Sequence, residues 1–259
     1  MLKAGKLSAK LLEDLVLNKL KYRRGDVLVH AGLGEDCAVI DFGDEVCVLS
    51  TDPITGASFS AGRLAVHVAC NDIAAAGARP VGVQVLLLLP ESADDHAAAA
   101  IMEEIASEAA SLGVEVLGGH TEVTDRILEP ILSLTAVGRA AKNGYVTSSG
   151  AKPGQGIVMT KFAGIEGSLV LMQDFSHTLA FIDEDDVLHY RSMLSVVPDG
   201  LAAAAFGVSA MHDATEGGIL GAAWEMAFAA GVCFSLKADA IPILPLTEKI
   251  CRTLELDPL

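Results

Sequence analysis

Positively charged residues are scarce in this sequence of 259 residues, which carries 18 Lys and Arg against 34 Asp and Glu and has a formal net charge of −16 at pH 7. A chain of this charge is repelled by a nucleic-acid backbone and by an anionic membrane surface, so neither is expected as a partner. A phosphorylated ligand remains compatible with the charge, because a bound divalent metal supplies the missing positive charge.

Cysteine pairs are also missing. None of the cysteines forms a CxxC motif or a close pair, and the five are Cys37, Cys47, Cys70, Cys233 and Cys251. We therefore expect free thiols in a reducing cytosol and no zinc site. Aromatic residues make up only 5% of the chain, and the apolar bulk of Ala, Val, Leu and Ile suits helices layered on a sheet.

Long hydrophobic runs are absent too. The longest run, VGVQVLLLL at residues 81–89, is interrupted by Gln84 and is too short to span a bilayer. Residues 1–26 are amphipathic and lack the apolar core of a signal peptide. These absences predict a soluble, cytoplasmic protein.

The order of expected elements places a mixed α+β half before an α/β half. In the first half the pattern predicts a surface helix over 7–20, a hairpin around the turn 42–45, a buried helix around 66–76, a strand at 81–89, a helix over 92–111, and strands at 114–119 and 131–138. Because residues 140–156 are rich in Gly, Ser and Lys, we place a domain boundary there, between residues 1–150 and 151–259.

The second domain is expected to be short of strands. Its pattern predicts strands at 157–162 and 231–236, a tight turn at 163–168, and a helix that starts near Gly217. A domain of about 110 residues with so few strands is thin for a closed core, so we expect it to be incomplete.

One carboxylate lies where it is least expected, in the middle of the apolar helix VHVACNDIAAAGARP at residues 66–80. Desolvating the ionised Asp72 costs several kcal/mol unless something cationic compensates it. Few structural uses exist for such a residue among Ala and Val, so a bound cation is expected beside it. His67, one turn earlier, is interpreted as a satisfied core histidine.

Further polar residues follow or precede strands, where α/β proteins place ligand groups. They are Glu35, Asp36, Asp52, His120, Glu122, Asp213 and Glu216. Taken singly, Asp36 and Asp52 also suit turns or helix caps, Asp213 or Thr215 suits a helix N-cap with Glu216 in the first turn, and GGHT suits a plain turn. Taken together, they form an oxygen-rich group suited to Mg²⁺, which favours a few carboxylates plus substrate phosphates.

Six motifs, in order, resemble those of the ATP-dependent superfamily of aminoimidazole ribonucleotide synthetase. They are GEDCAVI (34–40), STDPITGA (50–57), AVHVACNDIAAAGARPVGV (65–83), VLGGHTEV (116–123), KPGQGIVMTK (152–161) and MHDATEGGILGAAWEMA (211–227). The superfamily also holds the hydrogenase-maturation carbamoyl-dehydratase, thiamine-monophosphate kinase and selenophosphate synthetase. This sequence is most similar to the hydrogenase-maturation-like, synthetase-related branch.

The resemblance implies an N-terminal mixed-sheet domain that forms a barrel across a homodimer, a C-terminal α/β domain beside it, and ATP with Mg²⁺ in the cleft between them. It implies metal binding by Asp36, Asp72 and Asp213. The residues it implies at the nucleotide are Asp52, Asn71, Gly118, Gly119, His120, Thr121 and Glu216.

Two features depart from individual branches. Most branches have an acidic residue where this sequence has His120; the selenophosphate branch is similar in having histidine there, but its N-terminal reactive cysteine is missing. The hydrogenase-maturation branch carries its carbamoyl group on a cysteine at the C-terminal tail, whereas the last cysteine here is Cys251, inside a predicted helix. The nucleotide chemistry is therefore implied more firmly than the second substrate.

The function expected from these observations is an ATP- and Mg²⁺-dependent synthetase or phosphotransferase that activates a small substrate by γ-phosphoryl transfer. The alternatives are a non-catalytic nucleotide-binding partner of a maturation factor, a kinase similar to thiamine-monophosphate kinase, and a metal-binding structural protein without nucleotide.

Overall fold

The computed structural model describes residues 5–54 and 60–259. The end of the motif STDPITGA, at residues 55–57, and residues 1–4 of the amphipathic N-terminal segment lie outside the described residues. No described helix is both long and apolar enough to cross a bilayer.

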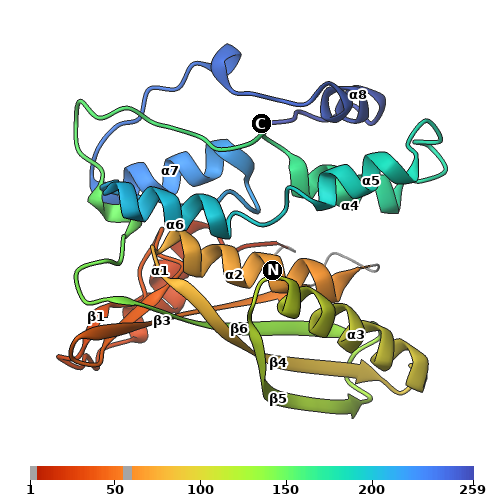
Figure 1. Cartoon of the computed structure of the whole chain (residues 1–259), viewed down its shortest axis with the longest axis horizontal. Helices are drawn as coiled ribbons and strands as arrows, with labels where there is room; N and C mark the ends of the chain where they lie inside the picture. Colours follow the sequence, from red (N-terminus) through yellow and green to blue (C-terminus); the bar gives the residue numbers. More distant parts are fainter. Residues whose placement is uncertain (1–4, 55–59) are drawn as a thin grey trace.

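One mixed sheet of six strands forms the base of the molecule, in the order β1-β2-β3-β6-β4-β5 (Figure 1). Its strands are β1 (Val27–Val29), β2 (Ala38–Asp41), β3 (Glu45–Ile54), β4 (Arg79–Pro90), β5 (Glu115–Thr124) and β6 (Ile131–Ala141). All neighbours are antiparallel except β4 and β5, which are parallel because α3 connects them as a crossover.

The predicted hairpin is confirmed as β2 and β3, with Asp41 opposite Val46. Gly43 adopts a positive φ of 97° at the turn, and its N–H donates to Asp41 Oδ1 at 2.9 Å. This left-handed conformation suits glycine, which has no Cβ to clash with the backbone. The hairpin places Ser50 and Asp52 on β3, a strand that continues beneath α2.

Two helices cover one face of the sheet, α2 (Ala61–Ala75) and α3 (Asp95–Ser111). Alternate residues of β4, such as Val83, Val85 and Leu87, point into the core beneath them. The predicted buried helix is thus confirmed as α2, and Gly77 ends it with a φ of 74°. Helix α3 begins at the N-cap Asp94, whose side chain accepts from the Ala97 N–H at 2.8 Å.

The remaining helices form a further layer on α2, on the side away from the sheet, except for α1 near the N-terminus (Figure 1). They are α1 (Ala9–Leu15), α4 (Ile165–Asp174), α5 (Glu184–Arg191), α6 (Val197–Phe206), α7 (Gly218–Ala230) and α8 (Pro245–Thr253), with single 3-10 turns η1 (Leu17–Lys19), η2 (Ser148–Gly150) and η3 (Ala238–Ala240). A second core between α4, α5 and α8 is separate from the core above the sheet.

The strands expected at 157–162 and 231–236 are absent from the structure. In this region the described residues contain only one isolated parallel bridge, between Ala163 and Ile243. Both segments are apolar enough for strands, but neither finds a neighbouring strand to satisfy its backbone groups. The tight turn expected at 163–168 is also wrong beyond Gly164, because α4 begins at Ile165.

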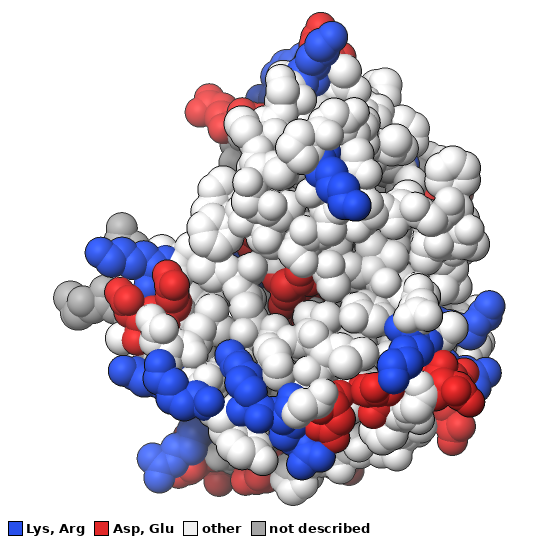
Figure 2. All heavy atoms as spheres, turned by 90° about the vertical axis from the view of Figure 1, so that its left-hand side faces the viewer, with Lys and Arg blue, Asp and Glu red and all other residues white. Residues whose placement is uncertain are grey.

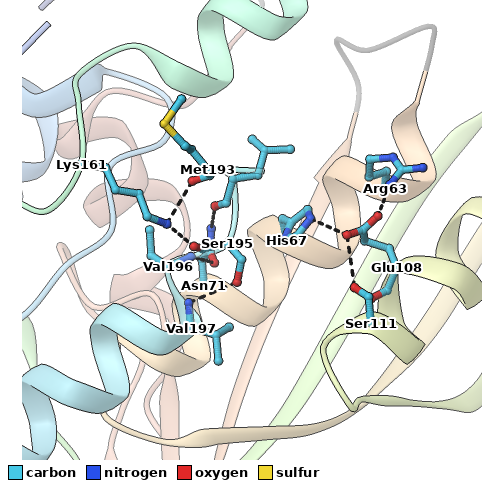
Figure 3. Close-up of polar contacts among 11 residues, drawn as sticks. Arg63, His67, Asn71, Glu108, Ser111, Lys161, Met193, Ser195, Val196 and Val197 are labelled. Carbon is cyan, nitrogen blue, oxygen red and sulfur yellow. Dashed lines mark hydrogen bonds and ion pairs between the residues drawn. The ribbon is translucent and has the colours of Figure 1, made fainter. Parts of the chain in front are cut away.

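Polar contacts tie the two layers together through α2 (Figure 3). The Asn71 amide donates to the Leu194 carbonyl at 2.9 Å and accepts from the Val196 N–H at 2.8 Å. From the other side, Lys161 donates to the carbonyls of Met193 and Ser195. The segment between α5 and α6 is therefore held from both layers.

A charged group joins α2 to α3 in the same view. Glu108 forms an ion pair with Arg63 and lies 2.9 Å from His67 Nε2 (Figure 3). Only 6% of the His67 side chain is exposed, and burial lowers its pKa despite the neighbouring carboxylate. His67 is thus a partnered core histidine that fixes the helix carrying Asp72.

Among the described residues, no helix packs on the opposite face of the sheet at β4 and β5. Val81 and Leu86 on β4 and Leu117 on β5 remain exposed by 36%, 39% and 49%. The register pairs His120 with Leu86, so the His120 side chain lies on this same face of β5. We refer to this as the open face of the sheet.

Candidate functional site

A small pocket lies between the first layer and the helices above it. Five chain segments line it, contributing Val29 from β1, Glu35, Asp36 and Cys37 before β2, Asp72 from α2, Val146 to Ser148 after β6, and Met211 to Asp213 before α7. Seen from the left-hand side of Figure 1, the molecule shows a small acidic group surrounded by uncharged side chains (Figure 2). The sequence therefore folds to bring distant carboxylates to one place.

Asp72 is the most deeply placed of the predicted aspartates, with 5% of the residue exposed. Its Oδ2 accepts from Ser50 Oγ at 2.5 Å, and the same hydroxyl lies 3.2 Å from Asp52 Oδ2. Burial, together with the negative charges of Asp213 and Asp52, raises the pKa of Asp72 to about 11. A carboxyl in this position ionises at neutral pH only when positive charge is added beside it.

Asp213 lies in the loop that leads to α7, and 6% of its side chain is exposed. Burial raises its pKa to about 6, an effect that His212 opposes and Asp36 reinforces. Its buried Oδ2 has no hydrogen-bond partner among the described residues. A buried carboxylate oxygen without a donor is a position that a ligand or cation is expected to fill.

His212 and Glu225 lie beside these aspartates; we refer to Asp36, Asp72, Asp213, Glu225 and His212 as the acidic cluster. His212 Nε2 lies 3.2 Å from Asp36 Oδ2 and 3.2 Å from Glu225 Oε2. Asp36, His212 and Asp213 can each place one potential ligand atom within 4.8 Å of the others. Within residues 5–54 and 60–259, no Lys or Arg pairs with Asp36, Asp72 or Asp213.

A divalent cation fits this donor set. The carboxylates carry more negative charge than one imidazole neutralises, and the orphaned Oδ2 of Asp213 offers a ligand atom without breaking an existing contact. Oxygen ligands of this kind suit Mg²⁺ together with phosphate oxygens. Asp36, Asp72 and Asp213 are therefore brought to one pocket, and Asp52 adjoins it through Ser50.

Three other acidic or amide residues make contacts within the protein. Asn71 uses its amide on the backbone of residues 194 and 196, as described above. Glu216 Oε1 accepts from the Lys6 N–H at 3.3 Å. Glu35 accepts from the N–H groups of Ser148 and Ser149 at 3.2 and 3.1 Å, so it holds η2 beside the pocket.

The glycine segment GGHT, which the resemblance implies at the nucleotide, lies in a strand and outside the lining of the acidic pocket. Gly118, Gly119, His120 and Thr121 are part of β5, at the edge of the sheet, and none of them lines the pocket. Gly119 packs against the Val85 backbone, with a φ of 146°, whereas a side chain at Gly118 would meet no atom within 4 Å. His120 lies 3.2 Å from Glu122 Oε2, and both side chains are exposed.

Four residues at or near the pocket are not predicted from the sequence: Ser50, Glu166, His212 and Glu225. The signal for Glu225 was available, since it is the one carboxylate within the apolar helix GILGAAWEMAFAA, the pattern that identified Asp72. No local pattern marks Ser50 or Glu166. Glu166 lies in the first turn of α4, and burial together with the charge of Asp213 raises its pKa to about 7.

Sequence comparison assigns both halves of the chain to known domains. Residues 34–140 match the family profile of AIR synthase related protein, N-terminal domain. Residues 152–259 match the profile of AIR synthase related protein, C-terminal domain. Together the matches cover most of the chain, in the order expected from the motifs.

Three curated relatives are similar along the chain. A putative hydrogenase expression/formation protein of Methanocaldococcus jannaschii is 27% identical, over 98% of this chain and 76% of its own length. Carbamoyl dehydratase HypE of Cupriavidus necator is 30% identical, over 76% of this chain and 56% of its own length. Selenide, water dikinase of Rhizobium meliloti is 29% identical, over 92% of this chain and 68% of its own length. The chain thus spans between about half and three quarters of these relatives.

Solved structures share the fold. A ThiL structure complexed with AMPPCP and TMP superposes with a TM-score of 0.78 at 18% identity, covering 99% of this chain and 82% of that one. A structure of hydrogenase maturation protein HypE in complex with ATP superposes with a TM-score of 0.72 at 22% identity, covering 99% of this chain and 76% of that one.

Proposed function

This chain belongs to the AIR synthase related family, and from that membership we propose that it binds ATP with divalent metal in the acidic pocket and transfers the γ-phosphoryl group to a small substrate. The observation that carries the proposal is the meeting of Asp36, Asp72 and Asp213 from three distant segments in one pocket. The ATP-bound HypE and AMPPCP-bound ThiL structures, which share the fold, support the choice of nucleotide.

The roles of the pocket residues follow from their contacts. Asp36, Asp72 and Asp213 would hold the metal, and the bound metal would neutralise charge on the β- and γ-phosphates. Ser50 keeps the Asp72 carboxyl in place through a 2.5 Å hydrogen bond. Glu35 holds η2 beside the same pocket by accepting from the N–H groups of Ser148 and Ser149.

In the proposed reaction a substrate oxygen forms a bond to the γ-phosphorus as the bond to the β-phosphate oxygen breaks, and ADP leaves. Little covalent chemistry is required of the protein, because positioning and electrostatic stabilisation account for most of the catalysis in phosphoryl transfer. Amide-, thio- and phosphate-bearing small molecules are the substrate classes we propose, in line with the relatives' names.

We also propose that two copies of the chain pair across the open face of the sheet. Val81, Leu86 and Leu117 expose apolar surface there, and the edge strand β5 leaves one side of its backbone without a neighbouring strand. In such a dimer Gly118 to Thr121 would lie at the subunit interface. We therefore propose that these residues contact nucleotide only in the context of the dimer.

A second candidate function is that of a non-catalytic nucleotide-binding partner protein. It is favoured by the stripe formed by Leu220, Trp224 and Phe228 on α7, which are exposed by 48%, 50% and 53%. Exposed apolar stripes of this kind mark contact surfaces for other chains. ADP release with a candidate substrate supports the enzyme, whereas nucleotide binding without turnover supports the partner protein.

The experiment that tests the proposed site is thermal unfolding with Mg²⁺, with ATP, and with both, on wild type and on Asp72→Asn. Asparagine keeps the shape and can still accept from Ser50, but it cannot provide a carboxylate. A ligand that binds only the folded state adds about 2.7 kcal/mol of stability at a hundred times its dissociation constant. We expect the joint gain in wild type and its loss in the variant.

Asp44→Asn, a substitution at an exposed turn residue, is the matched control and should keep the full gain. Wild type that shows no joint effect of Mg²⁺ and ATP would contradict the proposal. So would an Asp72→Asn variant that gains as much stability as wild type.

A further inference from the structure

Positive charge is concentrated at the start of the chain. Residues 5–24, which we refer to as the basic arm, contain six of the 18 Lys and Arg residues and two of the 34 Asp and Glu residues. The basic arm therefore has a formal charge of +4, and the rest of the chain has a formal charge of −20. Many of the basic side chains in Figure 2 lie on the lower half of the side on which Figure 1 places β1. A separation of charge of this size indicates a segment that contacts an acidic surface.

The basic arm is loosely attached to the rest of the described chain. None of its residues is buried, and α1 packs mainly on η1, which belongs to the same segment. A hydrogen bond of 3.3 Å from the Lys6 N–H to Glu216 Oε1 ties the start of the arm to the loop before α7. Large apolar side chains of the arm are exposed by between 40% and 82%: Leu11, Leu15, Val16, Leu20 and Tyr22. The arm thus presents apolar and basic side chains that its own fold leaves uncovered.

A surface of the opposite charge lies at the far edge of the sheet. Residues 122–129, EVTDRILE, end β5 and begin the loop that follows it, and we refer to them as the acidic edge. Its charged side chains are all exposed, and they are Glu122, Asp125 and Glu129 with the single cation Arg126. Val123 and Leu128 beside them are exposed by 61% and 90%. The acidic edge therefore combines negative charge with apolar side chains that the basic arm can cover.

The topology keeps the two surfaces apart within one chain. The basic arm leads into β1, the first strand of the order β1-β2-β3-β6-β4-β5, and the acidic edge belongs to β5, the last. Neighbouring strands lie about 4.8 Å apart, so the two edges of the sheet are separated by about 24 Å. A twofold axis across the open face of the sheet can place the β1 edge of one copy beside the β5 edge of the other. The same contact then forms twice, because each copy supplies both surfaces.

We propose that the basic arm of one copy docks on the acidic edge of a second copy of this chain. Charge complementarity decides the occupant, because the formal charge of −20 outside the arm attracts the arm of a second copy and repels an anionic membrane. The inference rests on the pairing of two copies across the open face, which is part of the proposed function, and it adds a contact at the edges of the two sheets. Exposed ion pairs each contribute little to affinity, so this contact is expected to govern the salt dependence and the orientation of pairing.

The test is the dissociation constant of the dimer formed by the full chain. Sedimentation velocity at several protein concentrations measures it in about 50 mM and about 300 mM NaCl. We expect the higher salt concentration to raise the dissociation constant of wild type several-fold, because salt screens attraction between exposed charges.

Two pairs of charge reversals test the two surfaces separately. Lys19→Glu/Lys21→Glu in the basic arm should raise the dissociation constant by about tenfold or more at the lower salt concentration, and Glu122→Lys/Glu129→Lys in the acidic edge should do the same. Lys152→Glu/Lys237→Glu, at exposed cations outside the arm, is the matched control for the added negative charge. It should leave the dissociation constant within about threefold of wild type.

A chain that carries both pairs, Lys19→Glu/Lys21→Glu/Glu122→Lys/Glu129→Lys, exchanges the charges of the two surfaces. It should bring the dissociation constant back to within about threefold of wild type, because the exchanged charges attract each other again. Loss of folding is not repaired by such an exchange, and circular dichroism checks that each variant is folded.

Three results would overturn the inference: no recovery in the exchanged chain, an equal effect of the matched control, or a dissociation constant that neither pair of reversals changes. A fourth is binding to vesicles of phosphatidylglycerol and phosphatidylcholine by wild type and not by Lys19→Glu/Lys21→Glu, with dimerisation unchanged. The arm would then contact a membrane and not a second copy.

The outcome can be separated from that of the proposed function. If Leu86→Asp yields the monomer while Lys19→Glu/Lys21→Glu pairs as wild type does, pairing across the open face stands and the inference fails. If the exchanged chain recovers pairing but ATP with Mg²⁺ adds no stability, the inference stands and the proposed nucleotide site fails. A wild type that is monomeric at every concentration contradicts both the inference and the homodimer.

Discussion

Asn71 and Asp72 are neighbours on α2 with separate tasks. The Asn71 amide bonds to the backbone of residues 194 and 196, while the Asp72 carboxyl lies in the pocket beside Ser50. Successive residues of a helix point about 100° apart, so one turn can face two surroundings. The residue that joins the two layers is therefore adjacent to the one proposed to hold the metal.

Glu166 offers a pH-dependent test at the scale of one residue. Its pKa in the folded protein is about 7, raised by burial first and by Asp213 second, against 4.5 for the ordinary side chain. Because the folded pKa is the higher one, its contribution to stability is complete below about pH 4.5 and is lost as the pH rises towards 7. Glu166→Gln removes this dependence.

We therefore expect the stability of Glu166→Gln relative to wild type to increase by about 2–3 kcal/mol between about pH 4.5 and pH 8. Urea unfolding at both pH values, with a chelator present, measures the change. Glu103→Gln on the exposed side of α3 controls for the loss of one carboxylate. A relative stability that is the same at both pH values would show that Glu166 does not titrate as described.

Some of the residues that line or adjoin the pocket can be predicted from the sequence, and others cannot. A lone carboxylate in an apolar helix is visible as a pattern, so Asp72 could be predicted and Glu225 could have been. Ser50 and Glu166 could not, because their importance depends on which segments meet across the pocket. Asn71 shows that being next to a pocket residue in the sequence does not predict a place in the pocket. Its neighbour Asp72 lines the pocket, whereas the Asn71 amide bonds to the backbone of residues 194 and 196.

At the scale of elements, α6 packs on α2 through a glycine. A Cβ at Gly200 would lie 2.5 Å from the Ala74 carbonyl oxygen, so the two helices approach backbone to backbone there. Alanine is the better helix former by about 1 kcal/mol, but overpacking a tight contact costs about 1–3 kcal/mol. We expect Gly200→Ala to lower the free energy of unfolding, measured by urea denaturation.

Gly167 is the matched comparison. It lies within α4, and a Cβ there would meet no atom within 4 Å. Gly167→Ala should therefore raise the free energy of unfolding by about 0.5–1 kcal/mol. If both substitutions change the free energy of unfolding in the same direction, helix propensity and not the contact with Ala74 determines the effect of Gly200→Ala.

The elements of the first half were predictable because their periodicity and their turn residues agree. Gly43 and Gly77 mark the hairpin turn and the end of α2, and both adopt positive φ. In the second half, apolar composition at 157–162 and 231–236 predicted strands that do not form. A strand depends on a partner far along the chain, and composition alone does not reveal whether that partner is present.

At the scale of the whole molecule, the proposed homodimer can be tested by mass. Light scattering coupled to size-exclusion chromatography should give wild type about twice its chain mass of 26.8 kDa. Leu86→Asp places a charge on the open face of the sheet and should yield the monomer. Phe206→Asp, at a residue that is 90% exposed at the end of α6, is the control and should remain dimeric. A monomeric wild type would refute the pairing.

The sheet topology also determines the order in which the molecule can be assembled. Strands β4 and β5 are linked by one helix, whereas β3 pairs residues 45–54 with residues 132–141 and so closes a long loop. Pairings between distant segments lose more chain entropy and form later than local ones. The acidic pocket combines residues 35–37, Asp72 and residues 146–148 with residues 211–213, so it forms only after segments from both halves of the chain have come together. The cation proposed to bind there would therefore report the joining of the two halves during synthesis, and would bind only after residue 213 is in place.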